Sequence, residues 1–112
     1  MPTLAAIREQ RRSERLSALR QGARTVAAEH PQAQVWLFGS LARGDWDAYS
    51  DVDLLAIAPA KPEAEALADA LLAAQLGDDV LAMPLDRWEQ LLSSDEPYWR
   101  EIRREAIRLD AP

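Results

Sequence analysis

The chain has 112 residues, 48% of them apolar and 29% charged, so we expect one globular domain around a single core. It has no cysteine and a single histidine, which excludes disulfides and cysteine nucleophiles and disfavours a multi-histidine zinc site. The longest wholly apolar runs are five residues, and the N-terminus lacks the continuous apolar segment of a secretory signal. A membrane span needs about 20 apolar residues. We therefore expect a cytoplasmic protein without membrane contact.

The net charge is −6 at pH 7 and is unevenly distributed along the chain. Residues 1–30 and 98–112 are mildly basic, whereas residues 31–97 hold thirteen acidic side chains against three basic ones. A duplex-DNA binder would present a basic face, so nucleic acid is not expected as a direct partner. An acidic middle suits a cation site, although composition alone favours ordinary solvated charge.

The first predicted element is a helix within residues 1–30, with Thr3 as its N-cap and Pro31 beyond its end. Apolar residues recur along it at helical spacing: Leu16, Leu19, Ala23 and Val26. The arginines lie mostly off that line and predict a solvated face: Arg11, Arg12, Arg15, Arg20 and Arg24.

Residues 31–83 are predicted to form the sheet core. A bulky apolar run, Val35–Phe38, reads as a buried strand, and it is followed by a turn and a short helix that Gly44 ends. The second strand is predicted over Asp51–Ala58 and the third over Asp79–Met83, with a helix between them. Residues 84–112 are predicted to form C-terminal helices, the last with a buried line of Trp99, Ile102, Ala106 and Leu109. The predicted fold class is α/β, with a small three-stranded mixed sheet packed with helices in one domain, 1–112.

The turn after the first strand is the first feature that suggests a function, because it suits phosphate binding. Gly39 allows the backbone to turn sharply and to approach a ligand closely. Ser40 stands at a helix N-terminus, where free N–H groups favour phosphate. Arg43, one turn further on, would reach a phosphate or an acidic loop residue.

The second feature is a pair of carboxylates at the start of the next strand. Asp51 and Asp53 are two residues apart and therefore point to the same face. Two carboxylates that close repel each other unless a cation joins them, and Mg²⁺ prefers such oxygen ligands. Asp79 is the best third acid, and Asp78 replaces it if the strand register is shifted by one. Taken singly, the turn and the acids also fit a plain strand-to-helix turn and solvated acids at a sheet edge.

Together these residues resemble the minimal nucleotidyltransferases, the MNT branch of the DNA polymerase beta-like superfamily. The resemblance covers nearly the whole chain and is carried by two motifs, Gly39-Ser40-Leu41-Ala42-Arg43-Gly44 and Ser50-Asp51-Val52-Asp53-Leu54. It implies the nucleotidyltransferase fold. It also implies nucleotide binding by Gly39, Ser40, Arg43, Gly44 and Ser50. Two Mg²⁺ ions would be bound by the catalytic acids Asp51, Asp53 and Asp79.

The implied reaction is transfer of a nucleoside monophosphate, AMP from ATP, to an acceptor. Members of this family are often antitoxins paired with a helical HEPN ribonuclease toxin, which some of them adenylylate. We therefore expect the acceptor to come from a HEPN-type partner or from a second subunit of a homo-oligomer. The alternative from a different class is a catalytically silent antitoxin that neutralises the toxin by contact.

Overall fold

A computed structural model describes residues 1–45 and 51–111 of the chain. Its centre is a four-stranded sheet with the order β3-β2-β1-β4. The strands are β1 (Gln34–Phe38), β2 (Asp53–Ala58), β3 (Asp79–Pro84) and β4 (Ile107–Arg108). β1 runs antiparallel to β2 and β4, whereas β2 and β3 are parallel, so the sheet is mixed. The predicted fold class is confirmed, with four strands in place of three.

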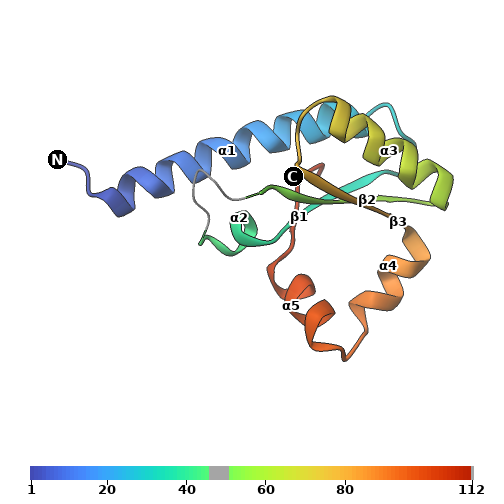
Figure 1. Ribbon diagram of the computed structural model, residues 1–112. Coiled ribbons are helices and arrows are strands. Elements are labelled where there is room, and N and C mark those ends of the chain that lie inside the picture. The colour runs from blue at the N-terminus through green and yellow to red at the C-terminus, as the bar shows by residue number, and fades with distance from the viewer. Residues whose placement is uncertain (46–50, 112) are drawn as a thin grey trace.

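Helices cover both faces of this sheet (Figure 1). α1 (Leu4–Ala27) and α3 (Lys61–Ala73) lie on one face, and α4 (Leu85–Leu92) and α5 (Pro97–Glu105) lie on the other. The short α2 (Ser40–Arg43) follows directly after β1. Among the described residues, no helix is both long enough and apolar enough to cross a membrane.

Alternation along β2 divides the core into two clusters. Leu54 and Ala56 pack with the residues of α1 and α3, whereas Leu55 and Ile57 pack with those of α4 and α5. All four side chains are fully buried. The period of two predicted from the sequence therefore holds, and both faces of the central strand are covered.

The prediction that residues 84–112 form only helices was wrong. α5 ends at Glu105, the backbone of Ala106 is extended, and β4 then pairs with β1. The backbone N–H of Leu109 donates to Val35 O at 2.8 Å, and Leu109 is fully buried. Leu109 is buried as predicted, but it lies directly after β4 and not on a helix.

The first half of α1 extends beyond the sheet (Figure 1). Thr3 caps the helix as predicted, since its Oγ1 accepts a hydrogen bond from Ala6 N at 3.0 Å. The buried residues of α1 are Leu19 and Ala23, both in its second half. The helix therefore packs on the core only after its midpoint, and its first half lies beyond the same end of the sheet as α2.

Candidate functional site

Three strand ends carrying the predicted site residues lie side by side. β1 ends at Phe38, which pairs with Asp53 at the start of β2. Asp53 in turn pairs with Asp79 at the start of β3. Residues directly opposite each other in a sheet point to the same face, so both carboxylates lie on one face at one end of the sheet. The structure therefore brings the Gly39 turn together with Asp53 and Asp79.

The turn after β1 requires glycine at its first position. Gly39 has φ 82° and ψ −158°, a backbone conformation that residues with a Cβ rarely adopt. A Cβ at this position would also lie 2.6 Å from Asp53 Oδ2. Gly44 closes α2 with φ 95°, as the sequence predicts, and its N–H donates to Ser40 O at 3.0 Å. The backbone of this turn is thus in direct contact with the Asp53 carboxylate.

The surroundings of Asp53 disfavour the charged form of its carboxyl. Partial burial raises the pKa of its carboxyl above the ordinary value of 3.8. The negative charges of Asp79, Asp51 and Asp78 raise that pKa further, in this order, while Arg43 lowers it. The carboxylates therefore lie close enough to repel one another.

Asp78 and Asp79, the two candidates for the third acid, have different surroundings. Asp78 Oδ2 accepts a hydrogen bond from Val52 N at 2.7 Å, so its carboxylate is bound to the backbone. Asp79 is exposed and is the register partner of Asp53. Asp51 is exposed just before β2. Ser50 lies outside the described residues.

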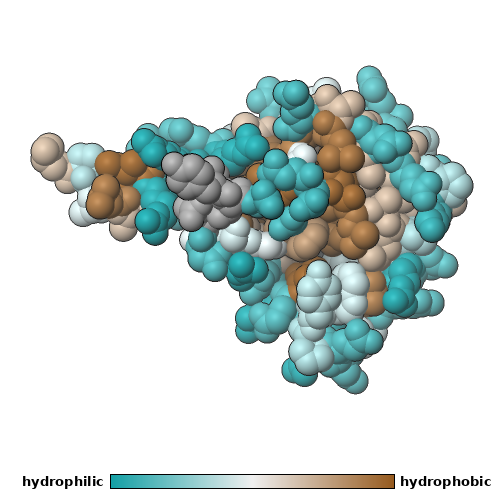
Figure 2. Space-filling view, viewed as in Figure 1, coloured by the Kyte–Doolittle hydropathy of each residue, from teal (hydrophilic) through white to brown (hydrophobic). Residues whose placement is uncertain are grey.

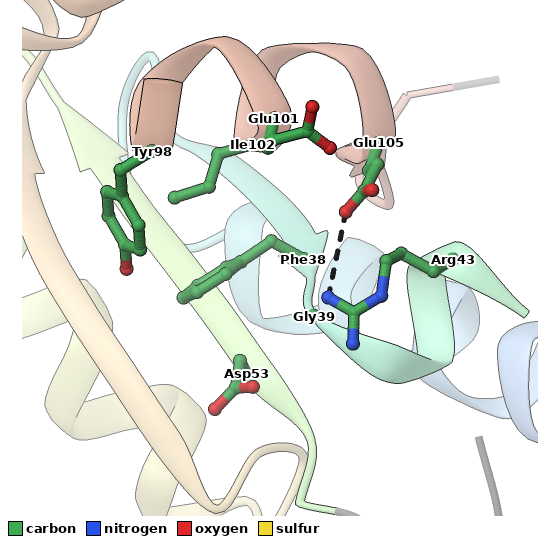
Figure 3. A pocket seen from close by; sticks show the side chains of 8 residues that line it. All are labelled: Phe38, Gly39, Arg43, Asp53, Tyr98, Glu101, Ile102 and Glu105. Carbon is green, nitrogen blue, oxygen red and sulfur yellow. Dashed lines mark ion pairs between the residues drawn. The ribbon is translucent and has the colours of Figure 1, made fainter. Parts of the chain in front are cut away.

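A pocket of about 280 Å³ opens beside Asp53 (Figure 3). The end of β1 and the α2 turn form one side, and α5 forms the other. It is lined by Phe38, Gly39, Arg43, Asp53, Tyr98, Glu101, Ile102 and Glu105. An ion pair between Arg43 Nη1 and Glu105 Oε2, 3.7 Å apart, crosses it, and Arg43 Nε is 3.4 Å from Asp45 Oδ2. Arg43 is thus held beside the pocket by two acids.

Arg12 supports the turn from α1, in contrast to the solvated position predicted for it. Its Nε donates to Leu41 O at 3.0 Å and its Nη2 donates to Ala42 O at 3.1 Å. The last carbonyls of a helix lack partners within the helix, and a guanidinium supplies two parallel donors. Arg12 therefore fixes the C-terminal end of α2 from a position 29 residues earlier in the sequence.

A family model described as a nucleotidyltransferase domain matches residues 19–107. That range includes the Gly39 turn, all four candidate acids and α5. The chain belongs to this family. Comparisons with curated proteins and with solved structures gave no significant match.

Membership in the nucleotidyltransferase domain family, within the polymerase beta-like superfamily, implies a nucleotide substrate and nucleotidyl transfer. This superfamily typically uses divalent metals. In residues 1–45 and 51–111, no three acidic or histidine side chains converge into a ready-made metal cluster. The donor atoms nevertheless suit Mg²⁺, because they are carboxylate oxygens and the charge of Asp53 is repelled by the neighbouring acids. Mg²⁺ commonly takes one or two carboxylates and completes its shell with water and substrate phosphates.

Sequence reasoning did not identify the wall that α5 contributes to this pocket. Tyr98 and Glu101 stand on a helix predicted only as a packing element, and nothing in their spacing relates them to the Gly39 turn. Arg12 gave no signal either, because it is one of six arginines in the first 30 residues. These side chains reach the site through tertiary packing alone.

Proposed function

We propose that this nucleotidyltransferase domain moves AMP from ATP to an acceptor hydroxyl in a Mg²⁺-dependent reaction. The observation that carries the proposal is the contact between the Gly39 turn and the Asp53 carboxylate, with Asp79 on the next strand. A phosphate-binding turn and paired acids at one sheet end supply what phosphoryl chemistry needs, namely positioning and charge neutralisation.

In this proposal the triphosphate lies on the turn. The backbone of Gly39 permits close approach, and the Ser40 hydroxyl and the N–H groups at the start of α2 donate to phosphate oxygens. Gly44 shapes the end of the turn, and Ser50, which lies outside the described residues, would add a hydroxyl. Arg43 would exchange its contacts with Glu105 and Asp45 for a phosphate, which is a stronger anion.

The acids Asp51, Asp53 and Asp79 would hold two Mg²⁺ ions, which would supply positive charge to neutralise the charge that develops during the transfer. The acceptor oxygen forms a bond to the α-phosphorus of ATP, and the bond from that phosphorus to the β-bridging oxygen breaks. Pyrophosphate leaves with the bonding electrons, and Asp79 takes the proton of the acceptor hydroxyl. The reaction therefore needs no protein nucleophile.

The pocket beside Asp53 is the place we assign to the nucleoside. Its apolar wall of Phe38, Tyr98 and Ile102 suits a flat base, because aromatic and aliphatic side chains offer stacking and dispersion contacts. It opens directly from Gly39, so a nucleoside there stays connected to phosphates on the turn.

The resemblance to minimal nucleotidyltransferases supports a HEPN-type helical toxin as the protein that carries the acceptor. The test is co-expression of the chain with such a toxin, followed by intact mass measurement of the toxin. We expect a mass gain of one AMP, with label incorporated from α-labelled ATP and not from γ-labelled ATP. Full transfer by an Asp53→Asn variant would rule out the proposed chemistry.

A second candidate function is neutralisation of the toxin by contact alone. The observation that favours it is the first half of α1, which extends past the sheet without buried residues and carries several arginines. In that case an Asp51→Asn, Asp53→Asn variant still protects cells from the toxin. Loss of protection in that variant would eliminate the contact-only function.

A further inference from the structure

The outer edge of β3 is an unprotected strand edge. β3 lies at the end of the sheet order, and within residues 1–45 and 51–111 no strand pairs with its outer side. An exposed edge offers a row of backbone donors and acceptors, and proteins commonly blunt it with lysine, internal proline or a bulge. β3 has none of these, because its only charge is Asp79 at the first position and its only proline is Pro84 at the last.

Apolar side chains accompany this edge. Leu81 in the middle of β3 is 45% exposed, and Leu72 on the adjoining helix α3 is 44% exposed. Figure 2 shows the hydrophobic surface continuing over α3 and β3, with hydrophilic residues around it. The opposite edge of the sheet, β4, has only two residues and gives little length for pairing. The β3 edge is therefore the place where this sheet can be extended.

We infer that a second copy of this chain pairs with the β3 edge, forming a two-fold symmetric dimer with one continuous sheet. A two-fold axis perpendicular to a sheet makes the two edge strands antiparallel and keeps equivalent faces on the same side. Directly opposite residues share a face of the sheet, and neighbouring residues of one strand alternate between the faces. One residue of β3 must therefore lie on the axis, opposite the same residue of the second copy. Centred on Leu81, the register places Leu81 opposite Leu81 of the second copy.

This register is symmetric about Leu81, so each exposed leucine is covered by the other and the acidic Asp79 side chains lie at the two ends. Asp79 falls opposite Met83 of the second copy, and Val80 falls opposite Ala82 of the second copy. The two Asp79 residues are then offset by four positions, or about 13 Å at the rise of a strand. That separation exceeds the screening length of about 8 Å at physiological ionic strength, so their repulsion is small. The cross-strand leucine pair removes the exposed apolar surface of both copies from water.

The same two-fold symmetry brings α3 close to its copy. This helix packs on β2 and β3 and is the element on its face that adjoins the edge. In the continued sheet, α3 and its copy lie on one face, on either side of the axis. Leu72 is 44% exposed on this helix, and the proposal expects the second copy to cover it.

The chain has no cysteine, which permits a direct test of this register. In a Leu81→Cys variant the two introduced thiols face each other, since Cβ atoms of directly opposite residues lie about 4.5–5.5 Å apart. We expect rapid oxidation to a disulfide-linked dimer. Leu4→Cys is the matched control, because Leu4 is 84% exposed on α1, far from β3. Cross-linking of Leu81→Cys no faster than that of Leu4→Cys would overturn the proposal.

Sedimentation equilibrium of the unmodified chain gives the second readout. We expect a dimer whose dissociation constant rises about tenfold or more in Leu81→Lys, because each copy then buries an ammonium group. Leu72→Lys on the helix should weaken the dimer as well, while Leu4→Lys should not. A chain that sediments as a monomer, or a dimer unchanged by both edge substitutions while circular dichroism shows an intact fold, would overturn the proposal.

Discussion

The Asp53 carboxylate lies against the backbone of Gly39, so that a Cβ on residue 39 would come within 2.6 Å of Oδ2. This contact joins the end of β1 to the start of β2, and it leaves room for a carboxylate only because residue 39 has no side chain. The acid and the turn are thus one structural unit, and a change in either displaces the other.

A Gly39→Ala substitution should therefore damage both stability and ligand binding. The residue has φ 82°, and holding a non-glycine residue in such a region costs about 1–3 kcal/mol. The added methyl group must also push the Asp53 carboxylate away from its position. We expect a fall of that size in the free energy of unfolding, measured by urea denaturation, together with loss of Mg²⁺-dependent ATP binding.

Gly44→Ala provides the matched comparison for that experiment. Its φ of 95° carries a similar backbone cost, but a Cβ there would meet Arg12 Nε only at 3.8 Å, an ordinary contact distance. We expect a comparable loss of stability with a smaller loss of ATP affinity. Equal loss of affinity in both variants would show that backbone strain, and not displacement of Asp53, is responsible.

The charge of Asp53 should make the fold and metal binding depend on pH in opposite directions. Its pKa is raised above 3.8 in the folded chain, so the folded state binds this proton more tightly than the unfolded state does. The contribution of Asp53 to stability is therefore most favourable below pH 3.8 and declines as pH rises through the folded pKa. Asp53→Asn should raise the melting temperature at pH 7, and a drop in melting temperature would contradict this account.

Mg²⁺ affinity should increase as pH rises, in contrast to the contribution of Asp53 to stability. Binding requires the carboxylate form, so affinity falls as pH decreases toward the raised pKa of Asp53. Calorimetry in buffers of different ionisation enthalpy should detect protons released on Mg²⁺ binding in that range. Absence of any proton release there would indicate that Asp53 takes no part in binding the ion.

Substitutions of Asp78 and Asp79 should have different effects, the first on stability and the second on the transfer rate. Asp78→Ala leaves the buried Val52 N–H without its acceptor, which costs about 1–3 kcal/mol of stability. Asp79→Asn at the exposed position should change stability by less than about 0.5 kcal/mol. It should lower the transfer rate about a hundredfold or more, because the proton acceptor is lost. The reverse pattern would make Asp78 the third catalytic acid.

Arg12 should act on nucleotide binding through the position of α2. Arg12→Ala removes two charge-assisted hydrogen bonds to Leu41 O and Ala42 O, and such bonds contribute about 1.5–3 kcal/mol each. Arg12→Lys restores the charge but not the parallel donors, so it should recover little. We expect KM for ATP to rise more than kcat falls, with exposed Arg11→Ala as the control. An Arg12→Lys variant with normal KM would refute the positioning role.

The parts of this fold that depend on local pattern were predictable. The Thr3 cap, the end of α2 at Gly44 and the two faces of β2 each follow from a few adjacent residues. β4 was not predictable, because Ile107–Arg108 is too short for a period and forms only by pairing with β1. The Arg12 contact and the α5 wall of the pocket were missed for the same reason, since each depends on which distant elements pack together.

We propose above all that the acids at the sheet end form a Mg²⁺-dependent nucleotide site. The most direct measurement is ATP binding by calorimetry, with and without Mg²⁺, for the unmodified chain and for an Asp51→Asn, Asp53→Asn variant. It requires no knowledge of the acceptor. We predict binding that depends on Mg²⁺ in the unmodified chain and is lost in the variant. Equal binding by both proteins, or binding by neither, would contradict the claim.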